Sequence, residues 1–442
     1  MNESRFVQYS LRTFLVQVVV TTLTVATTIL SARFLGPGGK GVLSLLVLIP
    51  ILGVTFGRLG LGNAVIYYAP KTSRPQLVLN GLLLSCGLGA AVSILVLPVV
   101  FGLKNSVFRT IPASWLIIMC GAVFFFFIYD FVVSILVALY RIGSRNFLVL
   151  SFSLGNLLLF VILVIGLGGK TKGALGAWCL ALLVSAGLGL VLLVGTIVRA
   201  KPKIDKALMK DLLRFGLKSH FGTTMEFLNY RADFFLVNLF ANPASVGLYS
   251  AAVNMAEIGW KLPEAVTVVF MPNVVRMSSA RAGEFVPRIC RVLLVSVTAF
   301  SLLVAVFRKP LILLFFGRPF LPSERALLIL LPGFMAFVVW KILSYSLMAQ
   351  GHPLKYSWTA ALAFLTMVVL DLGLIPRMGI EGAALASTVT YVLATMAAVV
   401  IYRRLTPCSL RELLIPRKSD WVVLADYARD LRLSWKRSGG KS

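Results

Sequence analysis

The sequence predicts an all-α polytopic membrane protein with twelve transmembrane helices, arranged as two six-helix lobes. The chain of 442 residues is 59% hydrophobic and only 13% charged, with a mean hydropathy of +0.92, whereas soluble domains carry about 25% charged residues. Apolar runs of about 20 residues recur from end to end, and each can cross a bilayer as a helix. A short turn-rich motif also occurs twice, half a chain apart.

The two copies of this motif are ARFLGPGGKGVLS at residues 32–44 and ANPASVGLYS at residues 241–250. Aligning Pro37 with Pro243 also aligns the next glycine and serine of the two motifs. A weaker match joins LYRIG at 139–143 to LMAQG at 347–351. A duplicated unit of six spans enters the membrane from the same side both times. The repeats are therefore related by a pseudo-two-fold axis along the membrane normal, and substrate is expected between them near the midplane.

The spans follow from the long apolar runs, which are too long and too evenly apolar for the strands of a membrane barrel. They are expected near residues 11–32, 42–68, 76–101, 112–139, 146–168, 174–198, 212–240, 246–275, 290–316, 324–349, 354–375 and 380–402.

The same pattern divides the chain into four parts. The N-terminal lobe covers 1–199, a basic cytoplasmic linker covers 200–211, and the C-terminal lobe covers 212–404. The tail, 405–442, is too polar to span and has apolar residues at helical spacing from Trp421 to Trp435, with basic residues beside them. Such a basic amphipathic helix suits the cytoplasmic face of an anionic bilayer.

The net charge of +27 would suggest a nucleic-acid partner in a soluble protein. Here the basic residues lie mostly in loops and the tail. This distribution is typical of the charges that orient a membrane protein, so we expect no nucleic-acid partner. With a cytoplasmic N-terminus, 27 Lys and Arg fall in cytoplasmic segments and 11 outside. An even number of spans then places both termini in the cytoplasm, as expected of a multi-pass protein of the cytoplasmic (inner) membrane.

No pattern typical of a metal site, a cofactor or an enzyme is found. The five cysteines form no CxxC pair, so we expect no metal and no disulfide framework. GLGGKTK at residues 166–172 contains GKT but lacks the glycine spacing of a phosphate-binding loop. We therefore expect neither an enzyme nor a bound cofactor.

Ionisable residues within the spans are the candidate functional residues, because a charge at the bilayer centre costs at least about 2.5–3.5 kcal/mol. The basic ones would hold an anionic headgroup, since arginine donates two parallel hydrogen bonds to phosphate. Alternatively, Asp233 and Glu257 could neutralise the nearest of these cations and join helices. The predicted substrate-binding residues are Arg58, Lys218, Arg231 and Lys261.

Acidic residues within the spans are candidates for coupling transport to an ion gradient. They are Asp130, Glu226 and Asp371. For Asp130 and Asp371 the alternative interpretation is helix packing. His220 could titrate near neutral pH, with an ordinary buried histidine as the alternative.

Four segments carry a resemblance to a known family. They are ARFLGPGGKGVLSL at 32–45, RADFFLVNLF at 231–240, NPASVGLYSAAVNMAEI at 242–258 and GIEGAALASTVTYV at 379–392. With them the chain resembles the polysaccharide transporter family, which includes the Wzx-type oligosaccharide flippases. This family belongs to the multidrug/oligosaccharidyl-lipid/polysaccharide exporter (MOP) superfamily.

The resemblance implies a fold and a function. The two lobes would form a V-shaped cleft, and alternating access would move isoprenoid-diphosphate-linked oligosaccharides from the inner to the outer leaflet for surface polysaccharide biosynthesis. Cationic residues would hold the diphosphate or acidic sugars. Membrane lipids, and a polysaccharide polymerase or glycosyltransferases, are the further partners expected.

Three alternatives compete with this reading. A cation-coupled multidrug exporter of the same superfamily would favour an acidic site in the N-terminal lobe, where Asp130 is the one acid within a span. A peptidoglycan-precursor flippase usually has two additional spans. A membrane-bound polymerase or ligase would typically show a large outside loop, and the outside loops here are short.

Overall fold

The computed structural model describes residues 3–105, 108, 111–198, 202–230, 232–241, 243–417 and 420, and within these residues it contains helices and no strand. The chain divides into two compact units. The N-terminal unit is Leu15–His220, and the C-terminal unit combines Met1–Phe14 with Phe221–Ser442. The sequence places the start of the second lobe at residue 212, whereas the division between the units falls inside a helix, after His220.

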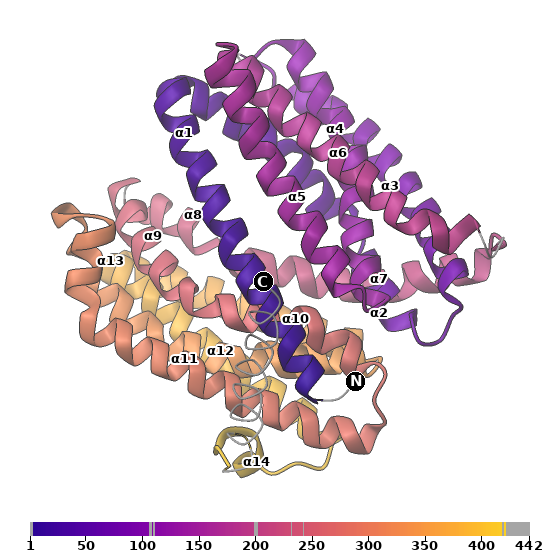
Figure 1. Ribbon diagram of the computed structural model, residues 1–442. Helices are drawn as coiled ribbons and strands as arrows, with labels where there is room; N and C mark the ends of the chain where they lie inside the picture. The colour runs from indigo at the N-terminus through magenta and orange to yellow at the C-terminus, as the bar shows by residue number, and fades with distance from the viewer. Residues whose placement is uncertain are drawn as a thin grey trace, which may run out of the picture. The chain divides into compact units, whose positions relative to one another are not determined.

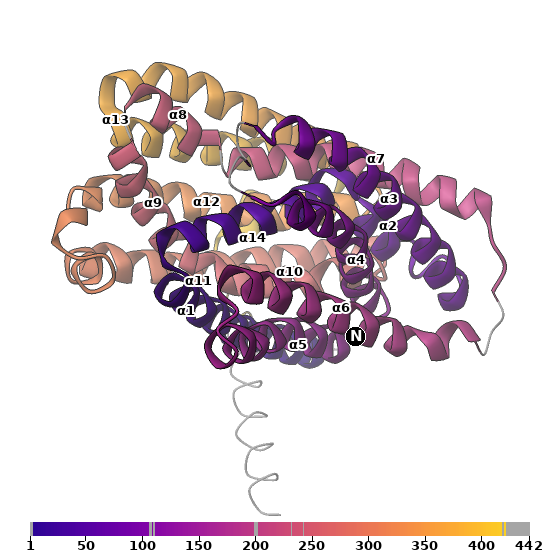
Figure 2. The same cartoon turned by 90° about the horizontal axis from the view of Figure 1, so that it is seen from above.

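The N-terminal unit is a helical bundle. Its neighbouring helices pack as α3 on α4, α4 on α6 and α5 on α6, and they lie together in Figures 1 and 2. The elements are most of α1 (Glu3–Gly57), α2 (Leu61–Tyr68), α3 (Arg74–Gly102), α4 (Ala113–Ala138), α5 (Ile142–Phe160) with the π-helical turn Val161–Gly166, α6 (Lys170–Val198) and the first part of α7 (Lys206–Asn229).

Helix α1 turns back on itself at the predicted corner. Its apolar stretch Gln8–Leu35 is long enough to cross a membrane alone, whereas Val42–Gly57 is long enough only together with α2, Leu61–Tyr68. Thr24 and Ile51 line one pocket, although a straight helix would hold them roughly 40 Å apart at 1.5 Å per residue. The chain therefore reverses between Leu35 and Val42, where glycine and proline are concentrated (Figure 1).

A second turn, between α1 and α2, depends on Gly60. This residue has φ +70°, in the left-handed region that disfavours side chains. A Cβ at this position would also lie 2.2 Å from the carbonyl oxygen of Gly216 on α7. The turn thus lets two backbones approach closely within the N-terminal unit.

Gly60→Ala is expected to lower the apparent melting temperature of the purified protein. The left-handed conformation alone costs alanine about 1–2 kcal/mol, and the contact with Gly216 adds to this. The control is Gly87→Ala in α3, where a Cβ meets nothing within 4 Å. A melting temperature of Gly60→Ala equal to that of the control would contradict this account.

The C-terminal unit is built around α12 (Ser323–Ala349), which packs against α11 (Ser279–Phe315), α9 (Pro243–Glu257) and α13 (Pro353–Leu405). Figures 1 and 2 show α11 and α12 side by side. Most of α12 is buried, including Trp340 and Phe337. The remaining elements are the end of α7, α8 (Ala232–Phe240), Ile258–Trp260, α10 (Lys261–Val274), Arg318–Phe320 and α14 (Leu410–Leu414).

The twelve ranges expected to span lie on helices, apart from short breaks and residue 231, which is not described. Within the described residues, eight helices are long and apolar enough to cross a membrane, or nine if the bent pair Val42–Gly57 and Leu61–Tyr68 is one span. Helix α13 holds the last two expected spans, joined at Gly379, whose φ of +58° interrupts the helix. The seventh and eighth expected spans are interrupted: α7 continues as α8, and α9 continues as α10.

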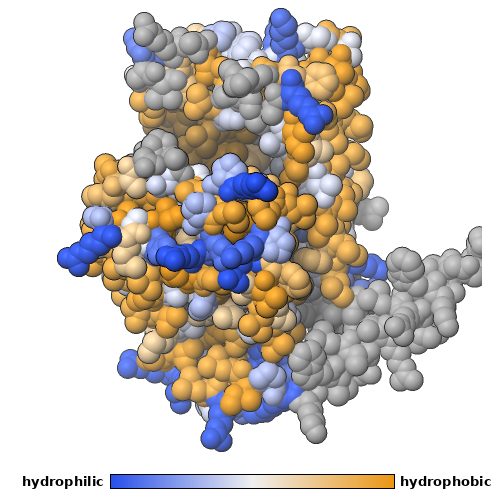
Figure 3. Space-filling view, turned by 90° about the vertical axis from the view of Figure 1, so that its left-hand side faces the viewer, coloured by the Kyte–Doolittle hydropathy of each residue, from blue (hydrophilic) through white to orange (hydrophobic). Residues whose placement is uncertain are grey.

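The outer surfaces of both units are apolar. Val191 of α6 is 69% exposed and Val306 of α11 is 70% exposed. Figure 3 shows broad hydrophobic areas, with hydrophilic residues gathered in a few places. Large apolar areas facing water are rare in soluble proteins, whereas lipid accepts them. The chain is therefore a multi-pass membrane protein.

The beginning of the tail is fixed to α11 by buried charges. Arg291 donates from Nε and from Nη2 to the two carboxylate oxygens of Asp420, both at 2.6 Å. Its third nitrogen, Nη1, donates to the backbone carbonyl of Glu412. Ser409 and Glu412 form a capping box at the start of α14. The amphipathic helix predicted from Trp421 lies outside the described residues.

Asp420 makes this attachment sensitive to acid. Burial acts to raise the pKa of Asp420, but hydrogen bonds from Arg291 and from the Arg417 backbone outweigh it and hold that pKa below 3.8. A lowered pKa contributes stability above the unfolded value, which is lost as the pH falls through the folded value. We expect the protection of residues 409–417 against hydrogen exchange, relative to the intrinsic rate at each pH, to fall below about pH 4, and Asp420→Asn to show the same loss of protection at neutral pH. Glu381→Gln, in an exposed ion pair with Arg325, should leave this exchange unchanged.

Candidate functional site

The N-terminal unit holds one predicted cation against one predicted acid. Arg58 follows the end of α1, and its Nη1 lies 3.4 Å from Oδ1 of Asp130 on α4. Both side chains are about one third exposed. The contact neutralises two charges within an apolar bundle, yet the partial exposure leaves the guanidinium accessible to an anion.

His220 and Lys218 lie on the part of α7 that belongs to the N-terminal unit. The His220 side chain hydrogen bonds to the backbone of Phe56 and interacts electrostatically with Arg58. The structure therefore gathers Arg58, Asp130 and His220. Lys218 is half-buried.

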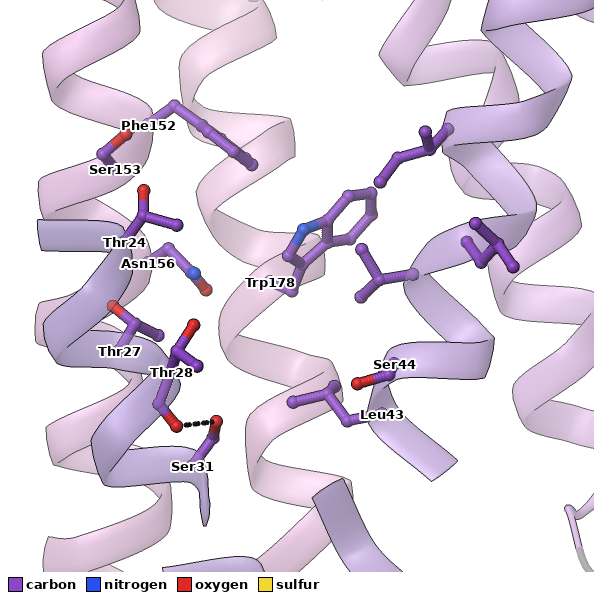
Figure 4. Close-up of a pocket in the computed structure, with 13 residues that line it drawn as sticks. Thr24, Thr27, Thr28, Ser31, Leu43, Ser44, Phe152, Ser153, Asn156 and Trp178 are labelled. Carbon is purple, nitrogen blue, oxygen red and sulfur yellow. Dashed lines mark hydrogen bonds between the residues drawn. The ribbon is translucent and has the colours of Figure 1, made fainter. Parts of the chain in front are cut away.

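A polar pocket of about 370 Å³ lies in the same unit, between the two arms of α1, α5 and α6. We call it the hydroxyl pocket. Figure 4 shows threonines of the first arm opposite Ser44 of the second, with Asn156 and Trp178 between them. Its lining residues are Thr24, Thr27, Thr28, Ser31, Leu43, Ser44, Val47, Leu48, Ile51, Phe152, Ser153, Asn156 and Trp178.

An apolar pocket of about 470 Å³ lies between the second arm of α1 and α3. Its lining includes Leu52, Phe56 and Val96 and contains no polar side chain. Leu48 lines both pockets. The arm 42–57 thus separates a hydroxyl-rich space from an apolar one.

In the C-terminal unit, Lys261 begins α10 and its Nζ lies 3.2 Å from Oε2 of Glu264. Its neighbour Trp260 stacks on Phe334, with ring centroids 4.2 Å apart. Lys341 of α12, 8% exposed, places its ammonium 5.7 Å from the centroid of the Trp260 ring. The indole face therefore stabilises a second cation beside Lys261 through a cation–π contact.

Each carboxylate oxygen of Glu226, a predicted coupling acid, accepts a hydrogen bond from a tyrosine hydroxyl. Tyr356 donates to its Oε2 at 2.7 Å, and Tyr230 donates to its Oε1 at 3.0 Å. The carboxylate is 7% exposed. The bond from Tyr356 joins α7 to α13, whereas Tyr230 lies just after the end of α7 itself.

Asp371 has the opposite environment. It is fully buried in α13, and neither carboxylate oxygen has a hydrogen-bond partner among the described residues. Asp233 of α8 interacts with it electrostatically and accepts a hydrogen bond from Tyr249 at 2.7 Å. Asp371 therefore has no hydrogen-bond partner within the described part of the chain, and a buried acid near another acid is most stable in its protonated form or beside a cation.

Sequence reasoning found some of these residues and missed others. Arg231 lies outside the described residues. Trp178, Asn156 and the threonines of α1 were not selected, although Thr24, Thr27, Thr28 and Ser31 recur at helical spacing within an apolar span and could have indicated a polar face. The pairing of Arg58 with Asp130, 72 residues away, had no local signal.

The two helical units and the apolar exterior define a multi-pass helical membrane protein that carries ionisable groups within its helices. A family model described as "Polysaccharide biosynthesis protein" matches residues 29–325. The chain belongs to this polysaccharide biosynthesis protein family. A comparison with curated proteins finds no match.

Solved structures with a similar fold are described as MATE or MOP superfamily transporters. An outward-facing multidrug resistance MATE family transporter of the MOP superfamily shares 17% identity, covering 91% of this chain and 96% of its own, with a TM-score of 0.78. A MOP superfamily transporter from Pyrococcus furiosus, for which a reversed polarity of the binding pocket is described, has 16% identity, the same coverage and a TM-score of 0.77. A point mutant of the Vibrio cholerae MATE transporter VcmN has 15% identity, coverage of 93% and 99%, and a TM-score of 0.72.

Proposed function

We propose that the protein is a flippase that moves isoprenoid-diphosphate-linked oligosaccharide units across the cytoplasmic membrane by alternating access, for surface polysaccharide biosynthesis. Its termini face the cytoplasm. Glycosyltransferases would supply its substrate, and a polysaccharide polymerase would use the unit after transport. The observation that carries the proposal is the match to the polysaccharide biosynthesis family over about two thirds of the chain.

The charged groups support an anionic substrate. Arg58 in one unit and Lys261 in the other are each about one third exposed beside a single carboxylate. A diphosphate carries more negative charge than the carboxylate it would displace, and arginine can bind it through two parallel hydrogen bonds. Arg58 and Lys261, with Lys218 and Arg231 as further candidates, are therefore proposed to hold the diphosphate.

The two pockets of the N-terminal unit support an amphiphilic substrate. The apolar pocket suits part of an isoprenoid chain, whereas a hydroxyl-rich space lies on the other side of the same arm of α1. An apolar chain gains free energy in proportion to the apolar area that it buries.

A multidrug exporter is the second candidate, favoured by the MATE transporters among the similar structures. The likeness to the Pyrococcus furiosus transporter indicates that this fold accommodates binding pockets of different polarity. In this chain the single acid of the N-terminal site, Asp130, is paired with Arg58, which disfavours a cationic drug there.

The decisive experiment is transport in proteoliposomes. Purified protein is reconstituted with a fluorescent isoprenoid-diphosphate-linked disaccharide, and its exposure to an external, membrane-impermeant enzyme is followed. The expected result is protein-dependent flipping of the glycolipid without efflux of ethidium, a cationic dye. Efflux of ethidium without glycolipid movement would support the drug exporter instead.

A further inference from the structure

The hydroxyl pocket has no part in the charge-based site. Its thirteen lining side chains include no acidic or basic group. Its volume of about 370 Å³ falls within the range of about 300–1,000 Å³ typical of small-molecule sites. The chemistry of its polar atoms therefore decides what it can hold.

Most of its hydroxyl groups already use their protons within the helices. Thr24 donates to the carbonyl of Val20 and Thr27 to that of Leu23, both at 2.8 Å. Ser153 donates to its own helix in the same way. A hydroxyl whose proton is used still has lone pairs to accept with, so these oxygens present acceptors to the pocket.

Two groups complement these acceptors. Trp178 is 8% exposed, and its Nε1–H has no partner among the described residues. Figure 4 shows this nitrogen turned toward the threonine arm and Asn156. The amide of Asn156, which also makes no hydrogen bond within the described part of the chain, can both donate and accept. A ligand acceptor in the pocket would give this donor the partner that the described residues do not supply.

The aromatic rings give the pocket a flat wall. Phe152 packs edge-on against Trp178, with ring centroids 6.2 Å apart and an interplanar angle of 86°. This contact fixes the indole plane beside the polar groups. The electron-rich face of an aromatic ring attracts polarised C–H groups, which line the faces of a sugar ring.

We propose that the hydroxyl pocket binds an uncharged sugar, a hexose or an N-acetylhexosamine. A polyhydroxylated ring offers many donors to the threonine and serine oxygens and acceptors to Trp178 and Asn156. A phosphate or uronic acid would be buried without a counter-charge, which is costly. This assignment rests on the proposed function and deepens it, by separating a sugar subsite from the cations that hold the diphosphate.

The test compares three lipids binding to the full-length protein in nanodiscs. They are a bare isoprenoid diphosphate, the same lipid carrying two N-acetylhexosamine residues, and one carrying two hexuronic acid residues. We expect the neutral glycolipid to bind at least about tenfold more tightly than either of the others, because two or more new hydrogen bonds of about 1 kcal/mol each are formed.

Two variants locate the preference. Trp178→Phe keeps a ring and removes the donor, and Asn156→Leu removes the amide at similar volume. Each should reduce the preference at least threefold while binding of the bare lipid stays unchanged. The control is Leu154→Ala on the same helix as Asn156, a residue that is 41% exposed and does not line the pocket. It should keep the full preference.

The outcomes separate the two proposals. If the wild type binds all three lipids equally, prefers the hexuronic lipid, or keeps its preference in both variants, the sugar subsite is overturned and the flippase proposal stands. If the wild type binds none of the lipids, both are overturned. A variant is included in the comparison only if its melting temperature lies within a few degrees of that of the wild type. If Asn156→Leu does not fold, Trp178→Phe alone decides the test.

Discussion

Arg58→Ala is expected to reduce surface polysaccharide, per amount of membrane-inserted protein, by about one to two orders of magnitude. Hydrogen bonds to charged groups contribute about 1.5–3 kcal/mol, and each 1.4 kcal/mol corresponds to a factor of ten. The measurement is cell-surface polysaccharide normalised to membrane-inserted protein, with glycolipid flipping in proteoliposomes as the direct assay.

The partner of Arg58 supplies the control. Arg58→Ala alone leaves Asp130 without its cation, and an unpaired charge in an apolar bundle destabilises the fold. In the double variant Arg58→Ala with Asp130→Asn, neither charge remains. The melting temperature should recover in the double variant while flipping stays low. Recovery of flipping together with stability would show that the pair is structural and that Arg58 does not hold substrate.

Asp371→Asn is the second substitution with a large expected effect. We propose that Asp371 and Asp233 share a proton or cation whose release couples transport to an ion gradient. Asparagine keeps the shape of Asp371 and cannot take up or release a proton. Gradient-driven accumulation of glycolipid in the outer leaflet should therefore fall at least tenfold.

Stability distinguishes coupling from packing at this position. Both oxygens of Asp371 are buried without hydrogen-bond partners in the described structure, so replacing it by a neutral amide removes no observed bond. We expect the melting temperature of Asp371→Asn to equal or exceed that of the wild type. The matched control is Glu226→Gln, which weakens two tyrosine bonds and should lower the melting temperature. Full gradient-driven transport by Asp371→Asn would exclude coupling through this residue.

The outline of the fold could be read from the chain. A backbone in lipid must satisfy its hydrogen bonds within each segment, so long apolar runs specify helices without reference to their neighbours. For this reason the twelve predicted ranges coincide with helices. Glycine and proline, which act locally, likewise marked the reversal of α1 before Val42 and the break in α13 at Gly379.

The shorter and more polar helices were harder to anticipate. The expected single spans at 212–240 and 246–275 are interrupted between α7 and α8 and between α9 and α10. Their polar residues find partners inside the unit, as Glu226 does with two tyrosines. Apolar length could not predict these interruptions, because they depend on side chains from other helices.

The sequence by itself determined that this chain is a helical membrane protein and which ionisable residues it carries into the bilayer. Only the tertiary structure decided their surroundings: Arg58 meets Asp130, Glu226 accepts bonds from two tyrosines, Asp371 has no hydrogen-bond partner among the described residues, and a face of threonines lines a pocket with Trp178. The physical reason is that hydrophobic length sets where a helix lies in the bilayer, whereas its rotation and tilt are set by packing against neighbours.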